Sequence, residues 1–226
     1  SLAVITGLLY CLAFPGFDVW PLAFVTWVPL YIALRGQTPK RALFLGLVSG
    51  TTMTFAGFYW LADMLRTFSG FPTIACLFFV FVLSVYQAGR IGLMTWLYAR
   101  ARDRGYPAAP VFACTFAASE LIYPLLFPWF YGATVYKQPI LAQTAELGGP
   151  IMVGLVLVSA NLFIAELILA RVEKRPVAKP LAGTTLAVVA LSIVFGAIRI
   201  ANVRKTMENA EMSQVGIVQG NMALIA

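Results

Sequence analysis

Three ionisable side chains lie inside long apolar stretches of the sequence: Arg90, Glu120 and Glu166. A charge at such a position is costly in a membrane, so it usually faces the interior of a helix bundle or a cavity, where it finds a partner. Counting a helical rise of about 1.5 Å per residue from the midpoint of each stretch puts Arg90 and Glu166 at nearly the same depth. We therefore predict a structural pair between Arg90 and Glu166, and Glu120 stays a candidate polar contact for a phospholipid headgroup.

Side chains for covalent catalysis are scarce in this chain. The 226 residues include no histidine, which excludes a Ser-His-Asp or Cys-His apparatus and any His-ligated metal site within them. Cys11, Cys76 and Cys114 are scattered through apolar segments without CxxC spacing, so neither a disulfide framework nor a zinc site is indicated. We interpret them as small packing residues, and we predict no metal and no cofactor.

The composition is that of a membrane protein. Hydrophobic residues make up 61% and charged residues 11% of the chain, against about 45–50% and about 25% in soluble domains. The net charge of +7 does not predict a nucleic-acid partner, because no basic patch is interleaved with aromatic residues and nearly all Lys and Arg lie between apolar stretches. Membrane orientation explains that distribution better.

The apolar stretches predict an all-α polytopic membrane protein with about seven transmembrane helices. A span needs about 20 apolar residues, and the first two stretches are short for one. Pro15, Gly16 and Pro21 break the chain into a hairpin between these two. The predicted spans are residues 2–14, 21–34, 42–62, 73–99, 108–127, 151–170 and 181–198.

Basic residues concentrate in alternate loops, which sets the expected orientation. The loops near residues 35–41, 100–104 and 171–179 carry ten Lys and Arg, whereas the opposite loops carry only Arg66 and Lys137 beside acidic residues. The first set should be cytoplasmic. The seventh span then delivers the C-terminal segment to the periplasmic side, although Arg199, Arg204 and Lys205 run against the trend.

The last residues change in character. Residues 214–221 form a short β-branched run that ends in Gly-Asn, which is typical of a buried strand. We predict a transmembrane domain over residues 1–200, a polar linker over 201–213, and the start of a second domain over 214–226. Five residues after Asn221 are too few to build that domain.

Four motifs occur in an order and spacing that resemble the bacterial apolipoprotein N-acyltransferases. Each motif alone is weak, but together they lie in register between matching apolar spans and cover nearly the whole chain. They are Phe14-Pro15-Gly16-Phe17-Asp18-Val19-Trp20-Pro21-Leu22-Ala23, then Tyr59-Trp60-Leu61 with Thr67-Phe68-Ser69-Gly70-Phe71-Pro72, then Phe127-Pro128-Trp129, and finally Val218-Gln219-Gly220-Asn221.

The resemblance implies a nitrilase-like α/β domain on the periplasmic side of the bacterial inner membrane, held by the helices. It implies an acyltransferase that moves an acyl chain from a phospholipid to the N-terminal cysteine amine of a diacylglyceryl-lipoprotein, through a thioester on a Cys assisted by a Glu and a Lys. In the family these three residues follow the Val218–Asn221 motif. We therefore expect none of the three in this chain, and no activity from the chain alone.

The resemblance and the residues suggest a lipid entrance at the outer ends of the spans. Trp129, Tyr131, Tyr136 and Glu120 are candidates to line it, because residues 128–150 are too long for a simple connection. Tyr59 and Trp60 are further candidates at the end of the third span. An aromatic belt at headgroup depth is the alternative interpretation of all these aromatic residues.

Two other functions stay open from the residues alone. A transporter or channel would use Arg90, Glu120 and Glu166 as a polar pathway, but the strand-like run at residues 215–219 counts against it. A noncatalytic membrane scaffold, or a homologue whose second domain lacks the catalytic residues, is the other alternative.

Overall fold

The computed structural model describes residues 1–208, 210 and 215–219 of the chain, and these residues form helices and connections without a strand. Eleven helical elements follow one another in this part of the chain. They are α1 (Leu2–Ala13), η1 (Trp20–Phe24), α2 (Val28–Ala33), α3 (Pro39–Gly57), α4 (Trp60–Ser69), α5 (Thr73–Asp103), α6 (Ala108–Ile122), η2 (Tyr131–Val135), α7 (Pro139–Ala142), α8 (Ala145–Val172) and α9 (Lys179–Glu208).

Proline and glycine fix where several helices begin and end. Pro39 is the first residue of α3, and Pro72 and Pro107 directly precede α5 and α6. Proline suits a helix N-terminus because the first turn needs no backbone donor. At the other end, α4 stops at Gly70, whose φ of 67° lies in the left-handed region that favours glycine.

The two helices in the most extensive contact, α3 and α5, pack backbone against backbone. A Cβ atom on Gly50 would lie 2.7 Å from the Cα of Ala88, and one on Gly46 would lie 2.9 Å from the Cα of Gly92. Small residues spaced four apart on both helices allow this close approach, as is common between membrane helices.

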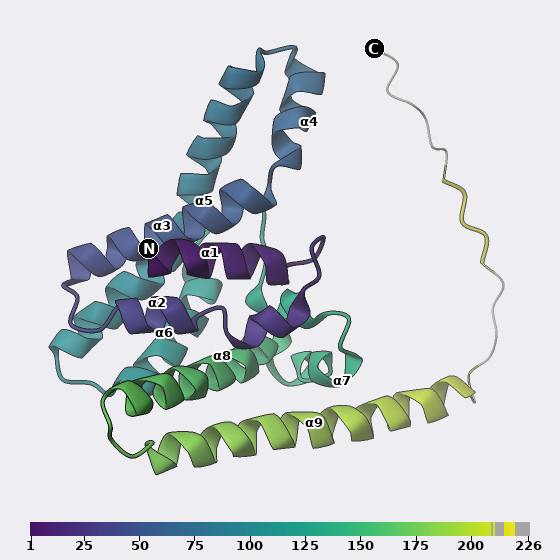
Figure 1. The fold of residues 1–226 in the computed structure, drawn as a ribbon. Coiled ribbons are helices and arrows are strands. Elements are labelled where there is room, and N and C mark those ends of the chain that lie inside the picture. The colour runs from purple at the N-terminus through teal and green to yellow at the C-terminus, as the bar shows by residue number, and fades with distance from the viewer. Residues whose placement is uncertain (209, 211–214, 220–226) are drawn as a thin grey trace.

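Most connections between helices gather at two opposite ends of the bundle, and the α4–α5 connection lies apart from both, at the tip of a projecting helix pair (Figure 1). The α2–α3, α5–α6 and α8–α9 connections, which carry the basic loops, lie together at one end, here called the basic end (Figure 1). The turn at residues 14–20 and the stretch at residues 123–144 lie at the other, here called the motif end. Helix α9 lies along the edge of the bundle and contacts α7 and α8.

The seven predicted apolar stretches are helical, but they are not seven full-length spans. Among the described residues, only α5, α8 and α9 are long and apolar enough to cross a membrane alone, with α3 and α4 as a fourth span if the bent pair is counted as one. Helix α1, the segment Trp20–Ala33 and α6 are shorter apolar helices. Seven complete crossings are therefore not established by length and composition.

Two predicted spans differ in shape from the structure. The stretch 42–62 is not one straight helix, because α3 and α4 meet at a bend of 62°. The stretch 108–127 is helical only to Ile122, since Tyr123 precedes Pro124 and takes an extended conformation with ψ of 122°. The residues after Tyr123 are therefore free to fold back over the bundle.

The structure describes only part of the predicted linker and strand. Helix α9 continues to Glu208, through the first eight residues of the predicted linker. Residues 215–219 have no regular secondary structure and are exposed, so the predicted strand is not formed there. A single strand has no neighbour to accept its backbone hydrogen bonds. Gln214, Gly220 and Asn221, the rest of the predicted strand, lie outside the described residues.

Candidate functional site

The first motif, the Tyr59 end of the second and the third meet at the motif end, although they lie far apart in the sequence. The rest of the second motif, residues 67–72, lies at the α4–α5 connection, away from this end (Figure 1). Aromatic side chains make the contacts, with their rings edge to face, an arrangement that favours aromatic pairs. The ring pairs are Phe14 with Trp129 at 5.5 Å between centroids, Phe17 with Tyr59 at 6.5 Å and Phe58 with Phe127 at 5.9 Å.

The centre of this cluster is Arg90 of α5, whose side chain is 2% exposed. Its Nη1 donates a hydrogen bond of 2.7 Å to the carbonyl oxygen of Trp129, and its guanidinium carbon lies 3.6 Å from the centre of the Trp129 ring. Nη1 also lies 3.4 Å from Oε1 of Glu120, and Nη2 lies 3.4 Å from the hydroxyl of Tyr10. Arg90 thus binds both the backbone and the ring of one residue while facing a buried carboxylate.

Glu120, in the last turn of α6, connects this cluster to the next element. Its Oε1 accepts a hydrogen bond of 2.9 Å from the backbone N–H of Tyr131, at the start of η2. Within the described residues its Oε2 is buried and has no hydrogen-bond partner. A buried carboxylate with one free oxygen depends strongly on its single cation.

The predicted pair between Arg90 and Glu166 is wrong. Glu166 of α8 binds Arg175 instead, with Oε1 and Oε2 at 2.5 and 2.8 Å from its two terminal nitrogens. The depth estimate failed because equal depth does not make two helices neighbours: α5 packs against α6, and Glu166 of α8 lies beside Arg175 of the α8–α9 connection. The charged residues thus form two separate pairs, and they do not line one polar pathway.

The irregular segment of residues 123–130, here called the return segment, folds back over α5. Gln87 of α5 donates a hydrogen bond of 3.1 Å to the carbonyl of Phe127 and accepts one of 2.9 Å from the N–H of Leu126. Non-helical backbone at membrane depth is tolerated only when protein groups satisfy it. Gln87 and Arg90, one helical turn apart, supply these groups for the return segment.

A second amide supports the cluster from the side of α8. Asn161 donates hydrogen bonds of 2.8 Å to the carbonyls of Ala23 and Leu157 and accepts one of 2.8 Å from the N–H of Trp27. The hydroxyl of Tyr131 donates to the same Ala23 carbonyl. Gln87 and Asn161 were not predicted from the sequence. Each is an amide side chain inside an apolar stretch, and that position could have indicated a buried polar contact.

The predicted entrance residues fall into two groups. Trp129 and Tyr131 are buried, at 7% and 0% exposure, so neither is a surface anchor. Tyr59, Trp60 and Tyr136 are exposed at 65%, 45% and 51%. The buried group therefore shapes the motif end from within, and the exposed group lies at its surface.

An ion pair ties the first motif to the stretch after the return segment. Nζ of Lys137 lies 2.7 Å from Oδ2 of Asp18. The hydrogen bond from Lys137 lowers the pKa of Asp18, and the same bond raises the pKa of Lys137. Asp18 has a φ of 62°, in the left-handed region that Asp and Asn tolerate better than most residues.

The arrangement holds apolar and aromatic groups in fixed positions, and it does not present a nucleophile. In the part of the chain that the structure describes, no hydrogen bond joins a cysteine to a carboxylate or a lysine. No group of three or more His, Cys, Asp or Glu side chains there could hold a metal ion. What this end presents is a set of aromatic side chains, some buried and some exposed.

Comparisons with known proteins agree on one family. A sequence model of the apolipoprotein N-acyltransferase N-terminal domain matches residues 6–163. An apolipoprotein N-acyltransferase of Geobacter metallireducens is 26% identical over 227 residues, which cover 98% of this chain and 43% of that protein. Those of Pseudomonas putida and Vibrio parahaemolyticus are 31% and 32% identical, over 66% and 70% of this chain and 30% and 33% of their own lengths. The chain thus spans less than half the length of these relatives.

Proposed function

Because the chain belongs to the apolipoprotein N-acyltransferase family, we propose that it forms the membrane domain of an enzyme that acylates lipoproteins. The acyl donor is a membrane phospholipid, and the acceptor is the N-terminal cysteine amine of a diacylglyceryl-lipoprotein. Both molecules are amphiphilic and lie in a leaflet of the membrane. A domain that holds apolar chains in place suits such a reaction, because orientation of the reactants removes much of its entropic barrier.

The catalytic residues in this proposal belong to a nitrilase-like domain that begins near residue 214. Its Cys nucleophile forms a thioester with the acyl chain, and a Glu and a Lys assist. The observation that carries the proposal is the direction of α9. Near its C-terminal end, Nε of Arg199 lies 2.5 Å from Oε2 of Glu146, and Gly196 packs against Ile140. The chain thus leaves the bundle at the motif end, where a following domain would meet Trp129 and the aromatic side chains around it.

The lipid entrance that we propose combines both groups of aromatic residues. Tyr59, Trp60 and Tyr136, which are exposed, contact the acyl chains or headgroups as these approach. Trp129, Tyr131 and Glu120, which are buried, hold the return segment in the shape that leaves room for an acyl chain. In this proposal Trp129 is a positioning residue, since it acts on the substrate through the segment that it fixes.

The proposed topology has seven crossings, with the basic end in the cytoplasm and the motif end in the periplasm of the bacterial inner membrane. Helix α1 has 12 residues, so it is about 18 Å long and cannot cross about 30 Å of hydrocarbon alone. The short elements α1, η1 with α2, and α6 complete their crossings with irregular segments whose backbone groups side chains of the bundle satisfy. The return segment is an example, because Gln87 and Arg90 donate hydrogen bonds to its backbone carbonyls.

The direct test is acyl transfer by the full-length protein purified in detergent. The protein is incubated with a phospholipid carrying isotope-labelled acyl chains and with a synthetic diacylglyceryl-lipopeptide. Mass spectrometry should find the lipopeptide heavier by one labelled acyl chain, attached to its N-terminal amine. A well-folded full-length protein that leaves the lipopeptide unchanged would instead support a noncatalytic membrane scaffold.

A further inference from the structure

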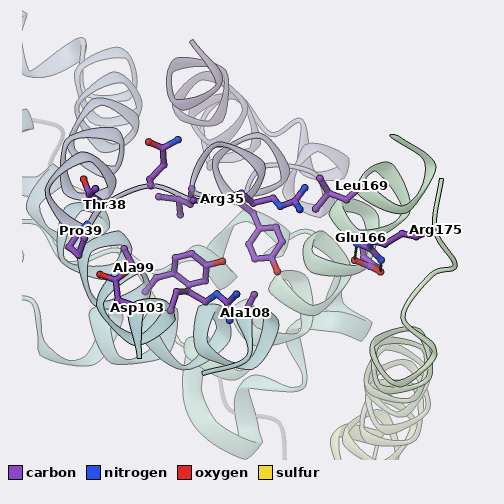
Figure 2. Close-up of a pocket in the computed structure, with 15 residues that line it drawn as sticks. Arg35, Thr38, Pro39, Ala99, Asp103, Ala108, Glu166, Leu169 and Arg175 are labelled. Carbon is purple, nitrogen blue, oxygen red and sulfur yellow. Dashed lines mark hydrogen bonds and ion pairs between the residues drawn. The ribbon is translucent and has the colours of Figure 1, made fainter. Parts of the chain in front are cut away.

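The basic end of the bundle contains a pocket that the proposed reaction does not use. Its volume is about 660 Å³, within the range of small-molecule sites. The ends of α2, α3, α5 and α8 and the α8–α9 connection line it. Figure 2 shows Glu166 and Arg175 together on one side of this pocket and Asp103 near Thr38 and Pro39 on the opposite side.

The charges around the pocket favour an anion. Three arginines line it: Arg35, Arg102 and Arg175. Arg35 lies 2.5 Å from Glu173, and Arg175 binds Glu166 and Glu173. Arg102 donates to the backbone carbonyl of Tyr106 and, among the residues described, forms no ion pair with a carboxylate. The guanidinium of Arg102 is therefore the one whose charge a bound anion would neutralise.

The charges of the three basic loops also favour an anion in the pocket. The three basic loops carry ten Lys and Arg side chains, and the acidic side chains beside them are Asp103, Glu166 and Glu173. Such an excess raises the local concentration of anions around the pocket. Clusters of basic residues at the cytoplasmic ends of membrane helices are a general feature of sites for anionic lipid headgroups.

An apolar groove adjoins the pocket and shares three of its lining residues: Tyr31, Ala108 and Glu166. Its volume is about 520 Å³, and it runs between α6, α8 and the first turns of α9. The rest of its wall is mostly small or apolar. It includes Ala109, Ala113, Leu155, Leu162 and Leu181.

We propose that the pocket and the groove together bind one anionic phospholipid from the leaflet at the basic end. The phosphate lies against Arg102 and Arg35, and one acyl chain lies in the groove between α6 and α9. A free phosphate would fill the pocket and leave the groove empty, whereas a neutral lipid would fill the groove and leave Arg102 without a counter-charge. The bound lipid would join α9, which packs only along the edge of the bundle, to the ends of α2 and α5.

The test measures the melting temperature of the full-length protein in detergent as phosphatidylglycerol is added. Binding to the folded state raises the melting temperature, and the rise grows with the logarithm of the ligand concentration divided by its dissociation constant. We expect stabilisation by phosphatidylglycerol, and much less by phosphatidylcholine of the same acyl chains or by inorganic phosphate. Equal stabilisation by phosphatidylcholine would refute the anionic site, and equal stabilisation by inorganic phosphate would refute the lipid as its occupant.

Two variants locate the site. Arg102→Gln should weaken phosphatidylglycerol binding about tenfold, whereas Arg66→Gln removes the same charge from α4, outside the pocket, and should leave it unchanged. Ala113→Phe fills the groove and should abolish the preference for phosphatidylglycerol over its soluble, deacylated headgroup. Unaltered binding in both Arg102→Gln and Ala113→Phe would overturn the proposal. Because Arg102 has no carboxylate partner among the described residues, its replacement leaves no buried charge behind.

Discussion

The guanidinium carbon of Arg90 lies over the indole of Trp129, 3.6 Å from the centre of the ring, and the guanidinium donates to the carbonyl of the same residue. One buried cation thus fixes both the backbone and the side chain of a residue on an irregular segment. A desolvated contact of this kind contributes about 2 kcal/mol or more. Glu120 supplies the opposing charge, so the position of Trp129 depends on an ion pair between α5 and α6.

The first prediction concerns this ion pair. Arg90→Met should destabilise the protein by about 3–5 kcal/mol, because it leaves the charge of Glu120 buried without a partner. Adding Glu120→Gln should recover part of that loss, since Gln keeps an acceptor for the N–H of Tyr131. Thermal unfolding in detergent measures both changes.

Glu166→Gln is the matched control for Glu120→Gln in this double-mutant experiment. Added to Arg90→Met it should give no recovery, because Glu166 binds Arg175 and not Arg90. Recovery with Glu166→Gln and none with Glu120→Gln would contradict the structural pairing and restore the one predicted from sequence.

The partner of Arg90 could not be found from sequence for a definite reason. The depth estimate compared positions along the helices, and depth does not say which helices are neighbours; α5 packs against α6. The apolar stretches did predict the helices, and the alternation of basic loops predicted which connections lie together, because both depend on local composition. The fold of the return segment depends on Gln87 and Arg90, some 40 residues away in sequence, and no local pattern indicates that contact.

The second prediction concerns Gly89, where the return segment comes closest to α5. A Cβ atom there would lie 2.0 Å from the hydroxyl of Tyr123, which donates a hydrogen bond of 2.6 Å to the carbonyl of Tyr86. Gly89→Ala should therefore destabilise the protein by about 1–3 kcal/mol through overpacking. Gly183→Ala on α9 meets open space and should be neutral or stabilising.

Rescue distinguishes this clash from a general loss of helix packing. Adding Tyr123→Ala to Gly89→Ala should cost less than the sum of the two single changes, since the ring that collides is gone. Additive losses in melting temperature would mean that Gly89 is required for another reason.

The third prediction concerns the Asp18–Lys137 pair and its pH dependence. The pKa of Asp18 is lowered, so its contribution to stability is present above about pH 4 and is lost as the pH falls through the folded-state pKa. The pKa of Lys137 is raised, so its contribution persists up to about pH 10 and is lost above that. The melting temperature of Asp18→Asn should lie slightly below that of the unchanged protein from pH 5 to 9, and the difference should vanish in acid.

Asn is the right replacement here because it tolerates the left-handed φ of residue 18. The effect is small, since the pair is exposed and screened by salt. A difference in melting temperature that persists below pH 3 would show that the carboxylate charge is not its cause.

The fourth prediction concerns orientation and uses a variant without native cysteines. With Lys174→Cys at the basic end and Lys137→Cys at the motif end, both positions are exposed. A membrane-impermeant maleimide added to intact spheroplasts should label residue 137 and spare residue 174 until the membrane is permeabilised. The reverse pattern would place the domain that follows α9 in the cytoplasm and rule out the proposed reaction at the periplasmic surface.

In the proposed enzyme, Trp129 positions the lipid donor and another domain carries out the covalent chemistry. The deciding measurement compares acyl-enzyme formation by the full-length protein from two donors, a phospholipid and a water-soluble short-chain ester. For Trp129→Ala we expect at least about a tenfold loss with the phospholipid, or about 1.4 kcal/mol of transition-state stabilisation, and little loss with the soluble ester. Trp129→Phe should recover part of the loss, because its ring still faces Arg90, and Trp96→Ala on the far part of α5 should change neither rate. Unchanged phospholipid kinetics in folded Trp129→Ala, or equal losses with both donors, would contradict the account.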